Sequence, residues 1–173
     1  MAEWLDIYDD TGNRVGRATR RECHGNPALL HHTAHVVVID RACDRILLQK
    51  RSAVKEIQPG KWDTAVGGHL DSGEDYETAA RREMREELGI VTDAPLEHIF
   101  DDRIRNEIES EDVRVFRIFH DGPFDFSRDE IDEVRFFAAE ELLLPENIAE
   151  FTPNLVSELN TLRERGIFPT SAK

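Results

Sequence analysis

The sequence predicts an α/β layered domain. Short strand-like runs lie on both sides of one central helix, and a second helix follows near the end of the chain. The chain has 173 residues, of which 39% are hydrophobic and 34% charged, so it can bury a core and has a soluble globular composition. Hydrophobic periodicity does not by itself give the order of the strands.

The first part of the chain is predicted to form strands. Trp4 to Tyr8 and Arg14 to Thr19 flank a segment rich in turn residues, so we expect a short β-hairpin. His24 to His32 is predicted to be a loop. His35 to Ile39 is rich in β-branched residues, which indicates a buried strand, and Ile46 to Leu48 is expected to pair back against it.

Shorter strands and loops are predicted around the central helix. The polar segment from Arg51 to Lys61 contains a Pro-Gly pair and is expected to be a loop. Trp62 to Val66 is strand-like, Gly67 and Gly68 follow it, and a loop is then expected up to Gly73. After the helix, Val113 to Phe119 and Val134 to Phe137 are predicted strands because apolar residues recur in each.

Two helices have recognisable ends. Tyr76 to Leu88 is rich in strong helix formers and carries a narrow apolar stripe. Asp75 is its expected N-cap, and Gly89 is a natural C-terminal stop. The last helix is predicted to begin at Pro153, with Thr152 as N-cap, since proline is favoured at the first helical position.

Composition limits the function classes. The formal net charge of -14 makes the chain a poor partner for nucleic acid polymers. No apolar run approaches the roughly 20 residues needed to span a bilayer, and no signal peptide is recognisable at the start, so we expect no membrane association and a cytoplasmic location. Cys23 and Cys43 are expected to be free thiols there.

Two domains of unequal size are predicted. We expect residues 1–32 to form a hairpin and loop extension that packs on a core domain of residues 33–173. A homodimer is left open by the sequence.

Three glutamates of the central helix project from one face, because they lie at spacings of three and four residues: Glu83, Glu86 and Glu87. Like charges at these spacings repel by roughly 0.2–0.5 kcal/mol per pair, so clustering them is useful when a cation lies between them. Magnesium prefers such oxygen ligands. The backbone at Gly68 is able to approach an ion closely, and its carbonyl is a candidate ligand. A solvated acidic helix face is the alternative interpretation.

The spacing around these glutamates is more specific. Gly68 is followed after five residues by Glu74, and after seven more by the segment from Arg82 to Ile90. This pattern resembles the Nudix box, the signature of the Nudix superfamily, at all its fixed positions. The resemblance implies a mixed β-sheet sandwiched between helices. It also implies a metal-dependent hydrolase that cleaves a phosphoanhydride bond in a nucleoside diphosphate derivative or related small-molecule diphosphate.

Roles follow from the resemblance residue by residue. It implies that Glu83, Glu86 and Glu87 hold Mg²⁺, or alternatively Mn²⁺, and that Glu74 and Arg82 position them. In the expected reaction a metal-bound water attacks phosphorus and a glutamate accepts its proton. Which glutamate is the general base stays open. The candidates are Glu83, Glu133, Glu107, Glu109 and Glu111.

A second resemblance is to the isopentenyl-diphosphate isomerase branch of the same superfamily. It rests on Leu48 to Ser52, Pro59 to Asp63 and Gly67 to His69. Arg51 and Lys55 resemble the diphosphate-binding pair of that branch. The resemblance also implies a metal site at histidines and acidic residues, although the sequence leaves open whether the three histidines form a second metal site. These residues are His24, His31, His69, Glu109 and Glu111.

The departures from the isomerases favour a hydrolase. Isomerisation in that branch needs a cysteine at the position of Gly67 and uses a tyrosine where this chain has Ile104. A catalytically silent diphosphate-binding module is the other alternative, but it would not need three glutamates together.

Overall fold

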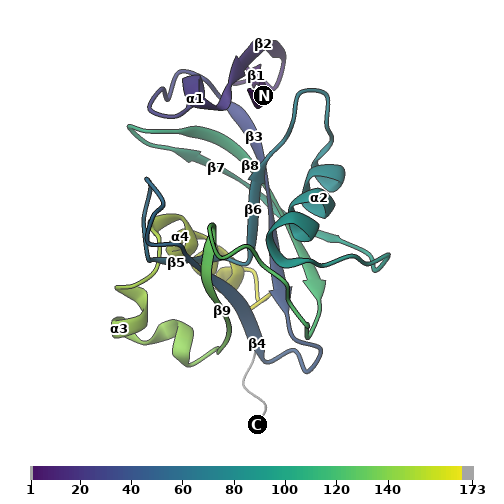
Figure 1. Ribbon diagram of the computed structural model, residues 1–173, viewed down its shortest axis with the longest axis vertical. Coiled ribbons are helices and arrows are strands. Elements are labelled where there is room, and N and C mark those ends of the chain that lie inside the picture. The colour runs from purple at the N-terminus through teal and green to yellow at the C-terminus, as the bar shows by residue number, and fades with distance from the viewer. Residues whose placement is uncertain (1, 169–173) are drawn as a thin grey trace.

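A computed structural model, which describes residues 2–168, shows a seven-stranded mixed sheet and a separate two-stranded hairpin (Figure 1). The strands are β1 (Trp4–Tyr8), β2 (Arg14–Thr19), β3 (His31–Ile39), β4 (Arg45–Arg51), β5 (Trp62–Thr64), β6 (Val66–His69), β7 (Glu97–Arg105), β8 (Ser110–Phe119) and β9 (Ile131–Ala138). The helices are α1 (Arg20–Cys23), α2 (Tyr76–Leu88), the 3-10 turn η1 (Glu141–Leu143), α3 (Pro145–Ile148) and α4 (Pro153–Glu164).

The large sheet divides into two branches. Strands β3 and β4 are antiparallel but pair only at Ile39 and Ile46. Beyond that point β3 pairs with β6 and, in parallel, with β8, which in turn pairs with β7. Strand β4 instead lies between β5 and β9. The two branches therefore separate toward one end of the sheet, as Figure 1 shows.

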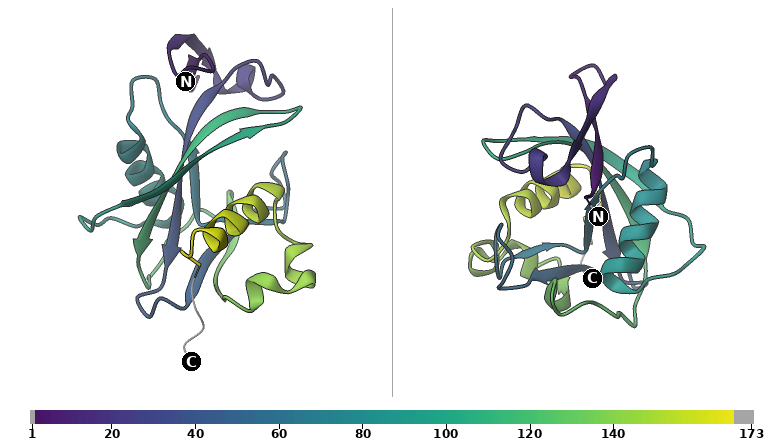
Figure 2. Two further views of the ribbon diagram at one scale, coloured as in Figure 1. Left: turned by 180° about the vertical axis from the view of Figure 1, so that it is seen from behind. Right: turned by 45° about the horizontal axis from the view of Figure 1, so that its top comes forward.

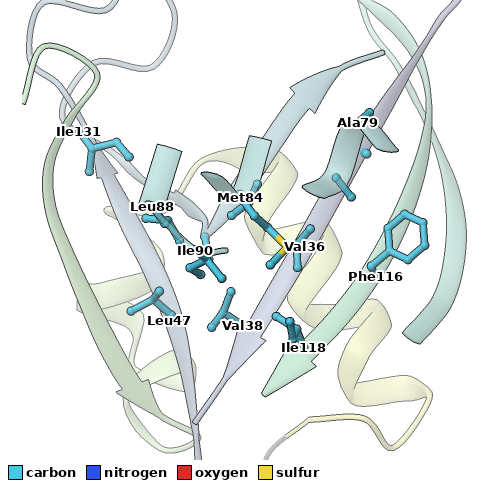
Figure 3. Packing of buried hydrophobic residues seen from close by; sticks show 14 of the residues in the cluster. Val36, Val38, Leu47, Ala79, Met84, Leu88, Ile90, Phe116, Ile118 and Ile131 are labelled. Atoms are coloured by element: carbon cyan, nitrogen blue, oxygen red, sulfur yellow. The ribbon is translucent and has the colours of Figure 1, made fainter. Parts of the chain in front are cut away.

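Helices cover both faces of the β3 branch (Figure 2). Side chains alternate along a strand, so β3 contributes to two cores. Val36 and Val38 pack in the core under α2, and Val37 and Ile39 pack in the core under α4. Figure 3 shows Met84 of α2 lying against the first of these pairs. Each fully buried side chain of this size stabilises the fold by about 1.5–3 kcal/mol. The predicted sheet between helices is confirmed.

Helix α2 has the predicted bounds and caps. The side chain of Asp75 accepts a hydrogen bond of 2.9 Å from the backbone N–H of Thr78. Gly89 ends the helix with φ 66°, a left-handed conformation that glycine adopts without steric cost. Helix α4 likewise begins at Pro153, with Thr152 as its N-cap. Both helices are thus fixed locally by the residues that the sequence singled out.

The N-terminal hairpin has the predicted strands and is attached to the rest of the protein by polar contacts. Asp6 accepts hydrogen bonds from the Ser72 hydroxyl at 2.7 Å and the Gly73 N–H at 3.0 Å. Arg105 donates to Asp10 at 2.6 Å. The division into residues 1–32 and 33–173 stays a prediction.

Some predicted boundaries were wrong. Strand β3 begins at His31, inside the expected loop. Strand β6 contains Gly67 and Gly68, which no predicted strand included, and ends at His69, inside the loop expected after Gly68. Glycines weaken the strand signal, yet here they lie in a strand that pairs only with β3. The segments that were not predicted are α1, β7, η1 and α3. Strand β7 is an edge strand with mostly exposed charged residues, so it lacks an apolar alternation.

Cys23 is buried and Cys43 is exposed, and both are free. No helix within residues 2–168 is long and apolar enough to cross a membrane.

Candidate active site

The predicted carboxylates meet the Gly67–Gly68 pair where α2 packs against β6. Glu87 Oε2 accepts a 3.1 Å hydrogen bond from the Gly67 N–H. Glu83 lies against Gly68 so closely that a Cβ at position 68 would overlap its carboxyl group. Glu86 is half exposed and lies one helical turn from Arg82. The two glycines of β6 have no side chains, and this lets carboxylates of α2 reach the strand.

Arg82 connects these carboxylates to the loop before the helix. It donates to both oxygens of Glu74, at 3.0 and 2.8 Å, and to the His69 carbonyl at 2.9 Å. It also donates to Glu83 at 2.6 Å and lies 3.4 Å from Glu86. Burial alone would raise the pKa of Glu74, but the hydrogen bonds from Arg82 hold it below its usual range. This arrangement is that expected of a pair that positions the other glutamates.

The carboxyl groups of Glu83 and Glu87 lie next to the glycines, and the positive charge around them does not offset the effect of burial on their pKa values. Burial and, to a smaller extent, the charge of Glu83 raise the pKa of Glu87 to about 8. Burial also raises the pKa of Glu83, although Arg82 opposes the shift. Two partly buried carboxylates whose surroundings oppose ionisation, next to the Gly68 backbone, fit the hard oxygen ligands of Mg²⁺ or Mn²⁺.

A pocket of about 230 Å³ opens beside these groups. Glu87 and Gly67 lie on one side of it, and Arg51 and Asp63 line another part. Arg51 donates to Asp63 at 3.3 Å and to the Ile57 carbonyl at 3.1 Å, so its guanidinium is held in place at the pocket wall. A guanidinium fixed in this way suits a phosphate ligand.

Two of the three predicted histidines form a compact cluster with Glu111. Candidate ligand atoms of His31, His69 and Glu111 all lie within 4.8 Å of one another. The ring of His24 lies farther out, 6.0 Å from that of His69. This set of two imidazoles and one carboxylate has the donor chemistry of a transition-metal site.

The buried ring of His31 is oriented within this cluster. Its Nδ1 lies 2.9 Å from the Leu29 carbonyl, which only accepts, so Nδ1 carries the proton. Its Nε2 lies 3.3 Å from Glu111 but is not aligned for a hydrogen bond. Burial would raise the pKa of Glu111, yet the rings of His31 and His69 hold it well below its usual range.

Other predicted residues lie away from the pocket or are already bound. Lys55 makes a close ion pair with Glu130 and is not a pocket residue. Glu133 is exposed on β9, and Glu107 is exposed in the turn before β8. Glu109 does line the pocket and accepts hydrogen bonds from two asparagine side chains.

Sequence reasoning missed several polar residues in and behind the pocket. Gln49 donates to Glu87 at 3.3 Å, and Asp63 accepts from the Thr152 hydroxyl at 2.9 Å. His35 and Glu158 form a buried pair, with Nδ1 and Oε2 2.7 Å apart. The available signal was a histidine next to an apolar strand and a glutamate beside the leucines that form the buried face of the last helix.

Known proteins share both the sequence and the fold. The NUDIX domain family matches residues 30–159. The chain is 35% identical over 164 residues to an uncharacterised Nudix hydrolase of Yersinia pestis, which covers 92% of this chain and 85% of the relative. It is 31% identical over 161 residues to the Nudix hydrolase YfcD of Escherichia coli strain K12, covering 91% of this chain and 84% of the relative.

Solved structures of other proteins have a similar fold. DR0079 from Deinococcus radiodurans has a TM-score of 0.74 and 26% identity, and the match covers 91% of this chain and 96% of that one. A MutT Nudix hydrolase from Burkholderia pseudomallei has a TM-score of 0.63 at 23% identity, over 76% of this chain and 96% of the other, and supports the fold alone.

The fold and the relatives define a hydrolase that acts on phosphoanhydride bonds. The chain belongs to the Nudix family. The isomerase-like branch suggested by the second resemblance is not supported, since the relatives named above are described as Nudix hydrolases.

Proposed function

We propose that the protein is a Mg²⁺- or Mn²⁺-dependent hydrolase of a small-molecule diphosphate, either a nucleoside diphosphate derivative or a related compound. The observation that carries the proposal is the pair of buried carboxylates at the two glycines of β6. Glu87 and Glu83 resist ionisation there, and Glu74 and Arg82 hold the neighbouring groups in place. The Gly68 carbonyl, Glu83, Glu86 and Glu87 are the proposed metal ligands.

A divalent cation at these ligands would supply neutralising charge for the phosphates and would lower the pKa of a bound water. The residues of the chain then have three tasks. Arg51 binds phosphate oxygens at the pocket wall, and the matching role of Lys55, which is paired with Glu130 outside the pocket lining, stays a prediction. The oxygen of the water bonds to phosphorus while the bridging P–O bond breaks, and the second phosphate leaves with the bridging oxygen. A pocket carboxylate accepts the proton of the water.

The position of each candidate relative to the pocket supports some general bases more than others. Glu109 and Glu111 line the pocket, and Glu83 lies beside it under Gly68. Glu133 and Glu107 are exposed, and neither is among the pocket residues. We therefore favour a base among the first three.

The test is a phosphate-release screen over diphosphate metabolites, run with Mg²⁺ and with Mn²⁺. The proposal expects at least one nucleoside diphosphate derivative or related diphosphate to be hydrolysed in a metal-dependent way. Binding without turnover across the screen would instead favour a silent binding module.

An isomerase control completes the test. Position 67 carries no thiol, Cys23 is buried in the N-terminal cluster, and Cys43 is exposed between β3 and β4. We expect no interconversion of isopentenyl and dimethylallyl diphosphates, and diphosphate hydrolysis should survive replacement of both cysteines by serine. A cytoplasmic location and a homodimer stay proposals that fractionation and sedimentation would test.

A further inference from the structure

One face of β3 carries polar side chains in its first half and apolar side chains in its second half. His31, Thr33 and His35 lie on the same face of the strand as Val37 and Ile39, because strand side chains alternate. The valine and isoleucine are covered by α4, whereas His35 and Thr33 line the pocket. His35 therefore lies where the buried core under α4 gives way to the pocket.

His35 is held by an acidic side chain from the opposite element. Glu158 of α4 lies on the helix face that also buries Leu155, Leu159 and Leu162. Only 8% of its side chain is exposed, and its Oε2 lies 2.7 Å from Nδ1 of His35. A carboxylate buried among leucines needs a cationic partner, and His35 supplies it. Burial alone would lower the pKa of His35, but the hydrogen bond and charge of Glu158 raise it to about 9.

The other edge of the ring faces the glycine of the active site. His35 is the register partner of Gly67 across β3 and β6. A Cβ at position 67 would lie 3.1 Å from His35 Cδ2 and 3.3 Å from Nε2, so the imidazole edge occupies the space beside this glycine. Among residues 2–168 no protein group makes a hydrogen bond to Nε2. Glu158 accepts the proton of Nδ1, and the raised pKa of His35 keeps a second proton on Nε2, so that the Nε2–H is able to donate into the pocket.

The pocket thus holds two basic side chains that are each held by a carboxylate. Arg51 is held by Asp63, and His35 is held by Glu158. Burial raises the pKa of Asp63, and the charges of Arg51 and His35 both oppose this shift, so the two cations are neighbours of one carboxylate. A diphosphate carries several anionic oxygens and accepts donors from more than one direction.

We propose that His35, held by Glu158, is a substrate-binding residue whose Nε2–H donates to an anionic oxygen of the bound diphosphate. The inference rests on the proposed function, since it assumes a diphosphate in this pocket. The alternative is that the pair only fastens α4 to the sheet. The two differ in whether Nε2 touches the ligand.

The test uses methylenediphosphonate, a diphosphate analogue with a P–C–P link, as the probe in the presence of Mg²⁺. Binding is measured by calorimetry on the wild type and on the double variant His35→Leu/Glu158→Leu, which replaces the buried pair by apolar groups without leaving a lone charge. His98→Leu is the matched control, because His98 also pairs with a carboxylate, Asp101 at 2.9 Å, but lies outside the pocket.

A second measurement does not depend on the fold of a variant. Spectra of ¹⁵N-histidine-labelled wild-type protein follow the Nε2 resonance of His35 during the titration, with Glu158→Gln to check the assignment. We expect the Nε2 signal to shift on binding. We also expect the double variant to bind the probe about 10-fold more weakly or worse, the loss of one hydrogen bond to a charged group, with the control within about 2-fold.

Two results would overturn the inference in distinguishable ways. Unchanged affinity in the double variant with a silent Nε2 resonance would show that the pair only fastens α4, and would leave the proposed function intact. A wild-type protein that neither binds the probe nor hydrolyses any diphosphate would overturn the proposed function and this inference together.

Discussion

Two groups of acidic side chains lie around one pocket, and they are built in opposite ways. In the glutamate cluster on α2, made of Glu83, Glu86 and Glu87, burial raises the pKa of Glu83 despite the charge of Arg82. Burial and the charge of Glu83 raise the pKa of Glu87 despite the hydrogen bond from Gly67. At the imidazole cluster, Glu111 has a lowered pKa because His31 and His69 lie beside it. The surroundings of Glu83 and Glu87 oppose a negative charge, whereas those of Glu111 favour one. Burial that opposes ionisation is thus a better sign of a hard-metal site than the number of carboxylates.

Removal of divalent metal should have the largest effect. We expect hydrolysis of a confirmed diphosphate substrate to fall to background in a chelator and to recover with Mg²⁺ or Mn²⁺. Arg82 is the cation beside the glutamate cluster, and a guanidinium cannot lower the pKa of a bound water as a divalent metal does. Phosphate release is the measurement. Full turnover in the chelator would remove the distinction between the two clusters.

Single charge removals at the glutamate cluster should come next. Glu86→Gln and Glu87→Gln should each lower the rate by at least about 10-fold, the lower end for groups around metal sites. Glu77→Gln on the first turn of the same helix is the control, since Glu77 is exposed and paired only with Arg81. A variant of Glu86 or Glu87 that turns over as fast as this control does not belong to the site.

The glycine of β6 offers a steric test. Gly68→Ala places a Cβ where the Glu83 carboxyl group lies, so Glu83 must move. We expect a loss of roughly 10- to 100-fold in kcat, because small displacements of catalytic groups are costly. Gly16→Ala, which meets open space, should behave as wild type. Equal kinetics for the two variants would contradict the proposed placement of Glu83.

Replacing a glutamate by glutamine should change stability in opposite directions at the two clusters. In a chelator at pH 7, Glu111→Gln should lower the melting temperature, because it removes the partner of two imidazoles. Glu87→Gln should raise it, since a carboxylate that is costly to ionise becomes neutral. For a chain of this size each kcal/mol corresponds to about 2–4 °C, so calorimetry resolves the signs. Melting temperatures that change in the same direction in both variants would show that the two clusters do not differ in this way.

The pH dependence of the Glu87 effect is the smallest expected signal. An acid whose folded-state pKa is raised keeps its proton in the folded protein while the unfolded chain ionises, so stability falls as pH rises from about 4.5 toward 8. The advantage of Glu87→Gln over wild type should therefore grow across this window and level off above it. Denaturant midpoints at a series of pH values, without metal, would measure it. A constant difference would show that Glu87 ionises normally.

Local signals explain what the sequence predicted. Helix α2 and its caps depend on neighbouring residues, and the spacing of Glu83, Glu86 and Glu87 follows from helix geometry alone. The pairing of His35 with Glu158 joins residues 123 positions apart, and strand β7 is defined by its partner β8. Neither leaves a local pattern, so both required the structure.

The two adjacent glycines of β6 have a consequence for how the sheet divides space. Successive residues of a strand face opposite sides, and here one glycine opens toward His35 and the next toward Glu83. At this edge of the sheet, side chains from the α2 side and from the α4 side can therefore approach the same ligand. Because each glycine leaves space on one side only, a methyl group at position 67 would displace His35 alone, and one at position 68 would displace Glu83 alone.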